Sequence, residues 1–416
     1  MPPRPLPPEY DAFAIAAPGL EPLVAAELAA LDIRAEAVPG GVMFRANVGI
    51  LARAQIGLRT ASRVVVRVAE FRATAFSELE REARQLPWAR FVGERTRFRL
   101  RVTCKKSKLY HSDAVAERVA AALIRAVPSA VWDESTGAPD DVEHIAEGSA
   151  EGSSELHAGT ESQSSSPSEG DVQLFVVRLD HDRCTISADA SGELLHRRGY
   201  RLAVARAPLR ETLAAAMLLG ARWDPSQPLV DPLCGSGTIP IEAAMLARGI
   251  APGLMRKFAA EHWPEAHAPA WTKARERARD AVRPTASAPI IGADRDDGAI
   301  AAAQSNAARA GVAADIEWRV AALSALELPP GPGLIIANPP YGVRVGEKGP
   351  LRDLFARFGQ LVAVRAVGWQ VALLSADRTL DDQMRLDFEE RFKTSNGGIP
   401  VRLAVATVRT RSRTRD

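Results

Sequence analysis

Short alternations of apolar and polar residues fill the first half of the chain. Residues 97–104 alternate charged and apolar side chains, and residues 62–69 contain three consecutive valines, as half-exposed and buried strands do. Stretches with apolar residues at helical spacing separate such runs, and in residues 76–86 Ser77 and Glu80 have the spacing of a capping box. The predicted strands are 13–16, 41–44, 62–69, 97–104, 172–179 and 185–190, and the predicted helices are 23–31, 50–58, 76–86 and 113–127. This order predicts small α+β units with antiparallel sheets.

From Pro208 onward the pattern changes to a longer alternation of strands and helices. Helices are predicted at 209–219, up to 247 and at 297–310, and strands at 228–230, 289–293, 316–320, 334–337, 370–374 and 401–408. This alternation predicts a doubly wound, mainly parallel sheet. Residues 250–288 interrupt it with an aromatic and basic excursion, in which we expect Trp263 and Trp271 to be core anchors.

An acidic segment interrupts the first of these patterns. Residues 133–172 contain 11 acidic residues and no Lys or Arg, are rich in Ser and Gly, and predict a disordered insertion. The flanking parts are basic: residues 1–132 have 20 Lys and Arg against 13 acids, and residues 173–416 have 33 against 27. Basic surfaces favour a polyanionic partner, although an arginine-rich composition alone would have the same effect. We predict domains at 1–60, 61–195 and 196–416.

Composition excludes several classes of protein. The chain has 416 residues, of which 46% are hydrophobic and 25% charged, as in ordinary soluble proteins. No stretch is apolar enough to predict a membrane span, and the first residues lack the apolar region of a signal peptide. The three cysteines are widely spaced, which favours neither a disulfide framework nor a zinc site. We therefore expect a cytoplasmic protein without a metal.

The most informative motif is Asn338-Pro339-Pro340-Tyr341, directly after the apolar run 334–337. The two prolines fix φ and remove N–H donors, so carbonyl acceptors are left to face outward. Asn338 adds an acceptor, and Tyr341 offers a ring on which a base can stack. Two acceptors on the hydrogens of a nucleobase amine favour its nucleophilic form during methyl transfer. A proline-rich turn after a buried strand is the competing interpretation.

A second motif, Asp231-Pro-Leu-Cys-Gly235-Ser236-Gly237-Thr238, ends a predicted strand and begins a helix. Its glycines allow close approach of a ligand, and the helix N-terminus favours an anion. It is neither a P-loop nor a complete dinucleotide fingerprint. Asp294 ends the next strand, where an acid accepts from ribose hydroxyls or caps a helix. Residues 320–324 contain no acid for an adenine amine, so that contact is left to backbone groups or Ser324.

The motifs DPLCGSGT, GADRDD and NPPYG, in this order, resemble class I S-adenosylmethionine-dependent methyltransferases that methylate amines. Residues 195–201 and 207–211, and the excursion that begins at 251, are similar to bacterial THUMP-domain RNA guanine-N2 methyltransferases, notably the enzyme of large-subunit ribosomal RNA. Residues 104–111 look like the THUMP signature, and residues 18–21 look like the N-terminal ferredoxin-like module. The resemblance implies an α/β fold: a Rossmann-like methyltransferase domain preceded by α+β ferredoxin-like and THUMP domains.

The resemblance also implies roles for the motif residues. S-adenosyl-L-methionine would be the cofactor, with its methionine part held by the turn from Gly235 to Thr238 and its ribose by Asp294. Asp231 would orient the turn. Asn338 and the Pro339 carbonyl would bind the N2 amine of a guanine in RNA, 23S rRNA in particular. In this arrangement Tyr341 would stack on the flipped base.

Two basic segments are candidates for RNA contacts. Ammonium groups beside aromatic rings suit phosphates and unpaired bases, although a solvated turn or an exposed loop would have a similar composition. The predicted residues are Lys105, Lys106, Lys108, Tyr110 and His111 in the first segment, and Arg197, Arg198 and Arg201 in the second.

Three alternatives to 23S rRNA guanine remain open. The first is a guanine in tRNA. The second is an adenine N6 amine or a protein glutamine, because the same motif serves these acceptors. The third is an RNA-binding or assembly factor without catalysis, against which the complete set Asp231, Asp294 and Asn338 argues. The sequence predicts no particular protein partner.

Overall fold

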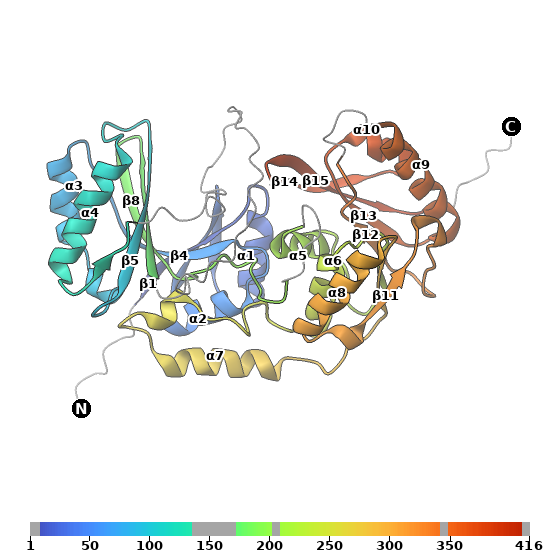
Figure 1. Cartoon of the computed structure of the whole chain (residues 1–416), viewed down its shortest axis with the longest axis horizontal. Coiled ribbons are helices and arrows are strands. Elements are labelled where there is room, and N and C mark those ends of the chain that lie inside the picture. The colour runs from blue at the N-terminus through green and yellow to red at the C-terminus, as the bar shows by residue number, and fades with distance from the viewer. Residues whose placement is uncertain (1–8, 135–171, 202–208, 342–347, 410–416) are drawn as a thin grey trace.

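The computed structural model describes residues 9–134, 172–201, 209–341 and 348–409, which form two sheets and their covering helices (Figure 1). The predicted acidic insertion lies almost entirely outside the described residues, and so does Pro208. The N-terminal sheet has the order β2-β3-β1-β4-β8-β7-β5-β6. Its strands are β1 Tyr10–Ile15, β2 Ala35–Val38, β3 Gly41–Ala46, β4 Arg63–Arg72, β5 Arg97–Lys105, β6 Val131–Trp132, β7 Val172–Asp180 and β8 Arg183–Asp189.

One face of this sheet is covered by α1 (Glu21–Ala30), α2 (Val48–Gly57), α3 (Phe76–Arg84) and α4 (Ser112–Ala126). Alternate strand residues, such as Ala12 and Ala14, enter this core. The expectation of antiparallel sheets was wrong at one end, because β5 runs parallel to β7 and β6. The predicted capping box was wrong too: no side chain caps α3 at Ala75, and Glu78 instead accepts hydrogen bonds from the preceding Thr74.

The two predicted N-terminal units share this one sheet. β4 pairs with β1 on one side and with β8 on the other, so main-chain hydrogen bonds continue across the predicted boundary. Because β4 pairs on both sides, the two units form one continuous sheet. The domain boundaries at 60 and 195 remain predictions.

The C-terminal sheet has the order β11-β10-β9-β12-β13-β15-β14. The first five of these strands pair parallel to one another, and β15 pairs antiparallel with both β13 and β14. The sheet is therefore mainly parallel, as predicted. The strands are β9 Leu229–Asp231, β10 Ile290–Asp294, β11 Ile316–Val320, β12 Leu334–Ala337, β13 Gln370–Ser375, β14 Glu389–Asn396 and β15 Ile399–Thr407. The helices are α5 Glu211–Gly220, α6 Thr238–Ala247, α7 Ala268–Asp280, α8 Asp297–Arg309, α9 Lys348–Arg365 and α10 Arg378–Asp381.

Both faces of the C-terminal sheet are buried. Leu334 and Ile336 of β12 enter the core on the side of α5 and α6, whereas Ile335 and Ala337 enter the core on the side of α9. A strand buried on both faces reads as a continuous apolar run, which is why the sequence identified β12. Among the described residues, no helix has the length and apolar character to cross a membrane.

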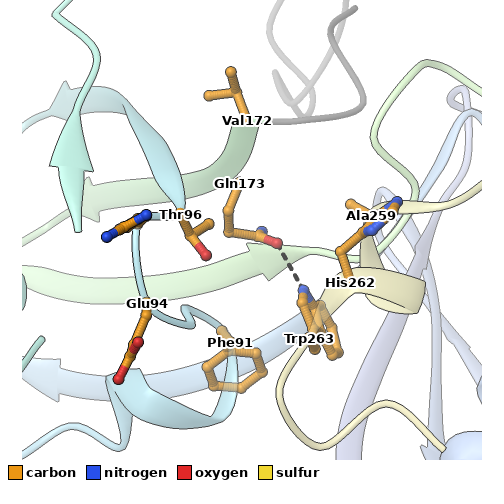
Figure 2. Close-up of a pocket in the computed structure, with 9 residues that line it drawn as sticks. Phe91, Glu94, Thr96, Val172, Gln173, Ala259, His262 and Trp263 are labelled. Atoms are coloured by element: carbon orange, nitrogen blue, oxygen red, sulfur yellow. Dashed lines mark hydrogen bonds between the residues drawn. The ribbon is translucent and has the colours of Figure 1, made fainter. Parts of the chain in front are cut away.

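The excursion 250–288 joins the two halves. Its helix α7 runs along the lower edge of the molecule in Figure 1 and contacts α2. Trp263 and Trp271 are buried anchors, as predicted, but they enter the core of the N-terminal half. Figure 2 shows the indole of Trp263 directed at Gln173 of β7, to which Nε1 donates a hydrogen bond of 2.6 Å. The Trp263 ring also contacts Phe91 edge-on, with centroids 5.0 Å apart.

A second contact between the halves uses the predicted ferredoxin-like signature. Gly19 has φ +84°, and a Cβ there would lie 2.0 Å from the main-chain oxygen of Lys393 in β14. The next residue, Leu20, is buried in the core of the C-terminal half. This turn therefore needs glycine in order to seat the first module on β14.

Candidate functional site

The predicted site residues meet at the carboxyl ends of three adjacent strands. Asp231 ends β9, Asp294 ends β10 on one side of it, and Asn338 follows β12 on the other. The chain passes from β9 outward to β11 and then returns to β12, so the order of strands reverses between β9 and β12. Ligands of open α/β sheets bind at such a switch point.

Both glycines of the turn adopt the left-handed conformation. Gly235 has φ +51° and Gly237 has φ +85°. A Cβ at Gly235 would meet no atom within 4 Å, so the space over this residue is open to a ligand. At Gly237 a Cβ would lie 2.6 Å from Cη2 of Trp318. This second glycine therefore makes room for a core tryptophan, a requirement that the sequence did not indicate.

Asp231 and Asp294 both accept hydrogen bonds from main-chain N–H groups of this turn. Asp231 is buried and accepts a hydrogen bond of 3.1 Å from the main-chain N–H of Leu233. Burial raises its pKa well above the usual range, and the charge of Asp294 acts in the same direction. Oδ2 of Asp294 accepts one hydrogen bond of 2.9 Å from the main-chain N–H of Gly235. Its Oδ1 accepts one of 3.0 Å from the main-chain N–H of Asp296. Each carboxylate oxygen of Asp294 keeps a lone pair for a ribose hydroxyl.

Ser236 and Thr238 are buried, with 5% and 6% of their surfaces exposed. The main-chain oxygen of Ser236 accepts a hydrogen bond of 3.1 Å from Asn306 of α8, which fixes the turn from the side of that helix. Both residues thus shape the turn through the main chain. They do not present side chains to solvent.

The sequence missed an apolar group beside Asp294. Val320 at the end of β11 is opposite Asp294 in register and is 59% exposed. An exposed valine at this edge offers an apolar surface to the flat face of a purine. The only signal in the sequence was its position as the last apolar residue of a predicted strand.

The NPPY motif forms a hydrogen-bonded chain with a residue that the sequence did not identify. Oη of Tyr341 donates to Oδ1 of Asn338 at 2.5 Å, and Nδ2 of Asn396 donates to Oη of Tyr341 at 2.9 Å. Burial raises the pKa of Tyr341 to about 12, so the phenol keeps its proton at neutral pH. Asn396 ends β14, a strand whose mostly polar sequence gave no apolar alternation.

This chain of hydrogen bonds fixes both groups of the motif. Because Oδ1 of Asn338 accepts from Tyr341, one of its two lone pairs remains for a substrate amine. The Tyr341 ring is half-buried and packs against the core on the side of α5 and α6. Pro339 is buried and Pro340 is exposed. Asn338 and Tyr341 are therefore held in place before any substrate arrives.

The first predicted RNA-contacting segment is exposed and rigidly supported. Lys105, Lys106, Lys108, Tyr110 and His111 are all exposed. Their loop is bound to the turn between β7 and β8, where Lys108 N–H donates to Oδ1 of Asp182 at 2.7 Å. Tyr110 is 68% exposed, and its ring centroid lies 4.0 Å from that of His111. The segment can present cations and rings to a ligand together.

Two of the three arginines in the second segment are buried or largely buried. The Arg198 guanidinium is buried, donates to the main-chain oxygen of Arg59 at 2.6 Å and lies 3.4 Å from the Glu242 carboxylate. Arg198 is therefore a structural link between the two halves and is withdrawn from the predicted RNA contacts. Arg201 is largely buried as well, with Nε 3.2 Å from the Glu211 carboxylate, whereas Arg197 is exposed. Only Arg197 of the three lies open to a polymer.

No group of three or more metal-ligating side chains is found within the described ranges. The polar groups at the strand ends are two carboxylates that accept from main-chain N–H groups, and an amide that accepts from a phenol. This set suits an organic ligand with hydroxyls and an amine.

Comparison with known proteins agrees with this geometry. Residues 198–404 match a family model described as an RMKL-like methyltransferase domain, and residues 11–65 match one described as an RlmL ferredoxin-like domain. A "Putative RNA methyltransferase slr0064" of Synechocystis sp. is 31% identical over 94% of this chain and 95% of its own. "Ribosomal RNA large subunit methyltransferase K/L" of Syntrophotalea carbinolica is 33% identical over 94% of this chain. The chain spans 52% of the length of that relative.

A solved structure extends the similarity to three dimensions. The structure of SMU.472, "a putative methyltransferase complexed with SAH", has a TM-score of 0.81 and 27% identity, and the match covers 97% of this chain and 99% of that one.

Proposed function

The chain belongs to the RMKL-like methyltransferase family, whose cofactor is S-adenosylmethionine, and we propose that it methylates the N2 amine of a guanine in 23S rRNA. The observation that carries the proposal is the hydrogen-bonded pair Asn338 and Tyr341. This pair follows β12, the neighbour of β9, and the glycine turn follows β9. A planar amine accepted by Asn338 would lie beside the group that supplies the methyl.

The residues divide this task among them. S-adenosylmethionine, when bound, supplies an activated methyl on a sulfonium. The open space over Gly235 and the lone pairs of Asp294 suit its methionine and ribose parts. Oδ1 of Asn338 and the Pro339 carbonyl would accept the two amine hydrogens, which would favour the nucleophilic form of the nitrogen. Tyr341 stacks on the flipped base. Positioning supplies most of the acceleration.

The choice of polymer and base has separate support. The exposed Lys105–His111 loop favours RNA over a protein glutamine, because cations beside rings bind phosphates and bases. The name of the K/L relative supports ribosomal RNA of the large subunit, and with such a substrate we expect a cytoplasmic protein. Guanine N2 rather than adenine N6 is supported by the resemblance in residues 195–201 and 207–211 and in the excursion that begins at 251.

Nucleoside mass spectrometry of a deletion strain tests this proposal. Loss of N2-methylguanosine from 23S rRNA alone is the expected result. Loss from tRNA, or loss of N6-methyladenosine, would replace the proposed substrate with one of the alternatives. Unchanged RNA in all pools, together with no heat on titration of S-adenosylmethionine into the protein, would favour a non-catalytic factor.

Asn396 should act on methyl transfer through Tyr341. We expect Asn396→Ala to lower kcat about tenfold with little change in KM for the cofactor, because loss of one hydrogen bond frees the Tyr341 phenol. In a Tyr341→Phe background the same substitution should have almost no further effect. Arg391→Ala, an exposed change on the same strand, is the control. Additive losses in the double variant would refute this coupling.

A further inference from the structure

The face of the N-terminal sheet that is opposite helices α1 to α4 carries a groove that the proposed chemistry does not use. It lies over β1, β2 and β3, on the opposite face from helices α1 to α4, and has a volume of about 550 Å³. Its lining includes Asp11, Phe13, Arg34, Met43, Arg45 and Arg67. The groove therefore combines an apolar floor with a charged rim.

The floor is a flat aromatic surface. Phe13 of β1 lies over Gly41 of β3, where a Cβ would be only 2.7 Å from Cε1 and Cζ of the ring. Glycine at this position thus lets the ring lie against the sheet, and the ring also lines the groove. Met43 is opposite Phe13 in register and 37% exposed. Together the two side chains form an apolar platform about as wide as two strands.

The rim is arranged for a chain of negative charges. Arg45 and Arg67 stand on either side of Asp11 in register, two residues along β1 from Phe13. Nη1 of Arg45 is 2.9 Å from Asp11, but 73% of the Arg45 side chain is exposed, so water competes for this pair. With Arg34 the groove has three cations against Asp11 and Glu36, a balance of +1. Arg67 in turn lies 3.0 Å from the Glu70 carboxylate, in a partly exposed pair. Both arginines can exchange such a carboxylate contact for a phosphate.

We propose that this groove binds an unpaired segment of the RNA substrate, with a base stacked on Phe13 and phosphates held by Arg45 and Arg67. The inference rests on the proposed RNA-methylating function. An open sheet with an aromatic residue and flanking arginines suits single strands, because every base has a face that can stack. A duplex hides its base faces, so it gains only the phosphate contacts. The exposed Lys105–His111 loop extends from the same sheet, at β5, and gives the polymer a second support.

Binding of a fluorescein-labelled oligouridine to the full chain, followed by anisotropy, tests the proposal. Phe13→Leu keeps an apolar contact with Gly41 but removes the ring, and we expect it to weaken binding about tenfold. Arg45→Gln and Arg67→Gln should each reduce the slope of log K against log salt by about 0.7. Asp11→Asn should tighten binding, because it removes the competing carboxylate. Arg84→Gln, an exposed charge change on α3, should leave the slope unchanged.

A blunt RNA duplex of the same length separates stacking from charge, since Phe13→Leu should not weaken its binding. Wild-type affinity of Phe13→Leu for oligouridine, with an unchanged salt slope in Arg45→Gln, would overturn the proposal and leave the groove to a protein segment. If Phe13→Leu does not fold, the proposal is tested by the affinity of Asp11→Asn for oligouridine and by the salt slope of Arg45→Gln, because both residues are exposed. Methylation of RNA by wild-type protein is measured separately, so failure of the groove does not count against the proposed function.

Discussion

Asn338→Ala should reduce methyl transfer about a thousandfold while leaving cofactor binding within about twofold of wild type. The substitution removes the side-chain oxygen that would accept the substrate amine, and it also deprives Tyr341 of its hydrogen-bond acceptor. The glycine turn and Asp294 are on the other strands, so the cofactor site keeps its contacts. Calorimetry with S-adenosylmethionine and formation of methylated nucleoside measure the two effects separately.

Asn47→Ala is the matched control for Asn338→Ala. Asn47 accepts a hydrogen bond from Ile50 at the start of α2, far along the chain from the motif. Loss of this cap should cost about 1 kcal/mol of stability without changing turnover. Undiminished turnover in Asn338→Ala would sink the proposed role of the amide, and equal losses of cofactor binding and turnover would point to a collapsed site.

Arg198→Met should destabilise the protein by about 3 kcal/mol, the other large effect that the structure implies. The substitution leaves the Glu242 carboxylate buried beside Tyr200 and removes the hydrogen bonds to the main-chain oxygens of Arg59 and Leu195. Chemical denaturation followed by fluorescence measures the change in the free energy of unfolding. RNA binding by the folded fraction should keep its salt slope, because this guanidinium does not reach solvent.

The neighbouring exposed residue gives the control for Arg198→Met. Arg197→Met removes the same charge one position earlier and should change the free energy of unfolding by about 0.5 kcal/mol or less. Replacement of both buried partners, Arg198→Met with Glu242→Leu, should recover part of the loss, because neither member of this ion pair is then left buried without the other. Equal destabilisation by Arg197→Met and Arg198→Met would show that the buried link has no special importance.

Sequence patterns located most strands and helices because their signals are local. The continuous apolar run of β12 and the glycines after β9 are typical of a buried parallel strand and a strand-to-helix turn. β14 was not predicted, because its exposed positions are charged and its apolar contacts lie in distant segments. For the same reason Asn396 gave no signal: its partner Tyr341 is 55 residues away in the sequence.

The sequence by itself determined which polar groups stand at the strand ends: the glycine turn, Asp294 and the NPPY motif needed only their neighbours to be recognised. Only the tertiary structure decided which basic and aromatic residues face a ligand. Arg198 and Phe13 show why. Arg198 is buried beside the Glu242 carboxylate, which is 44 residues away in the sequence. Phe13 lies against Gly41 of another strand and lines a groove. Exposure depends on packing between distant segments, and no local pattern of residues records it.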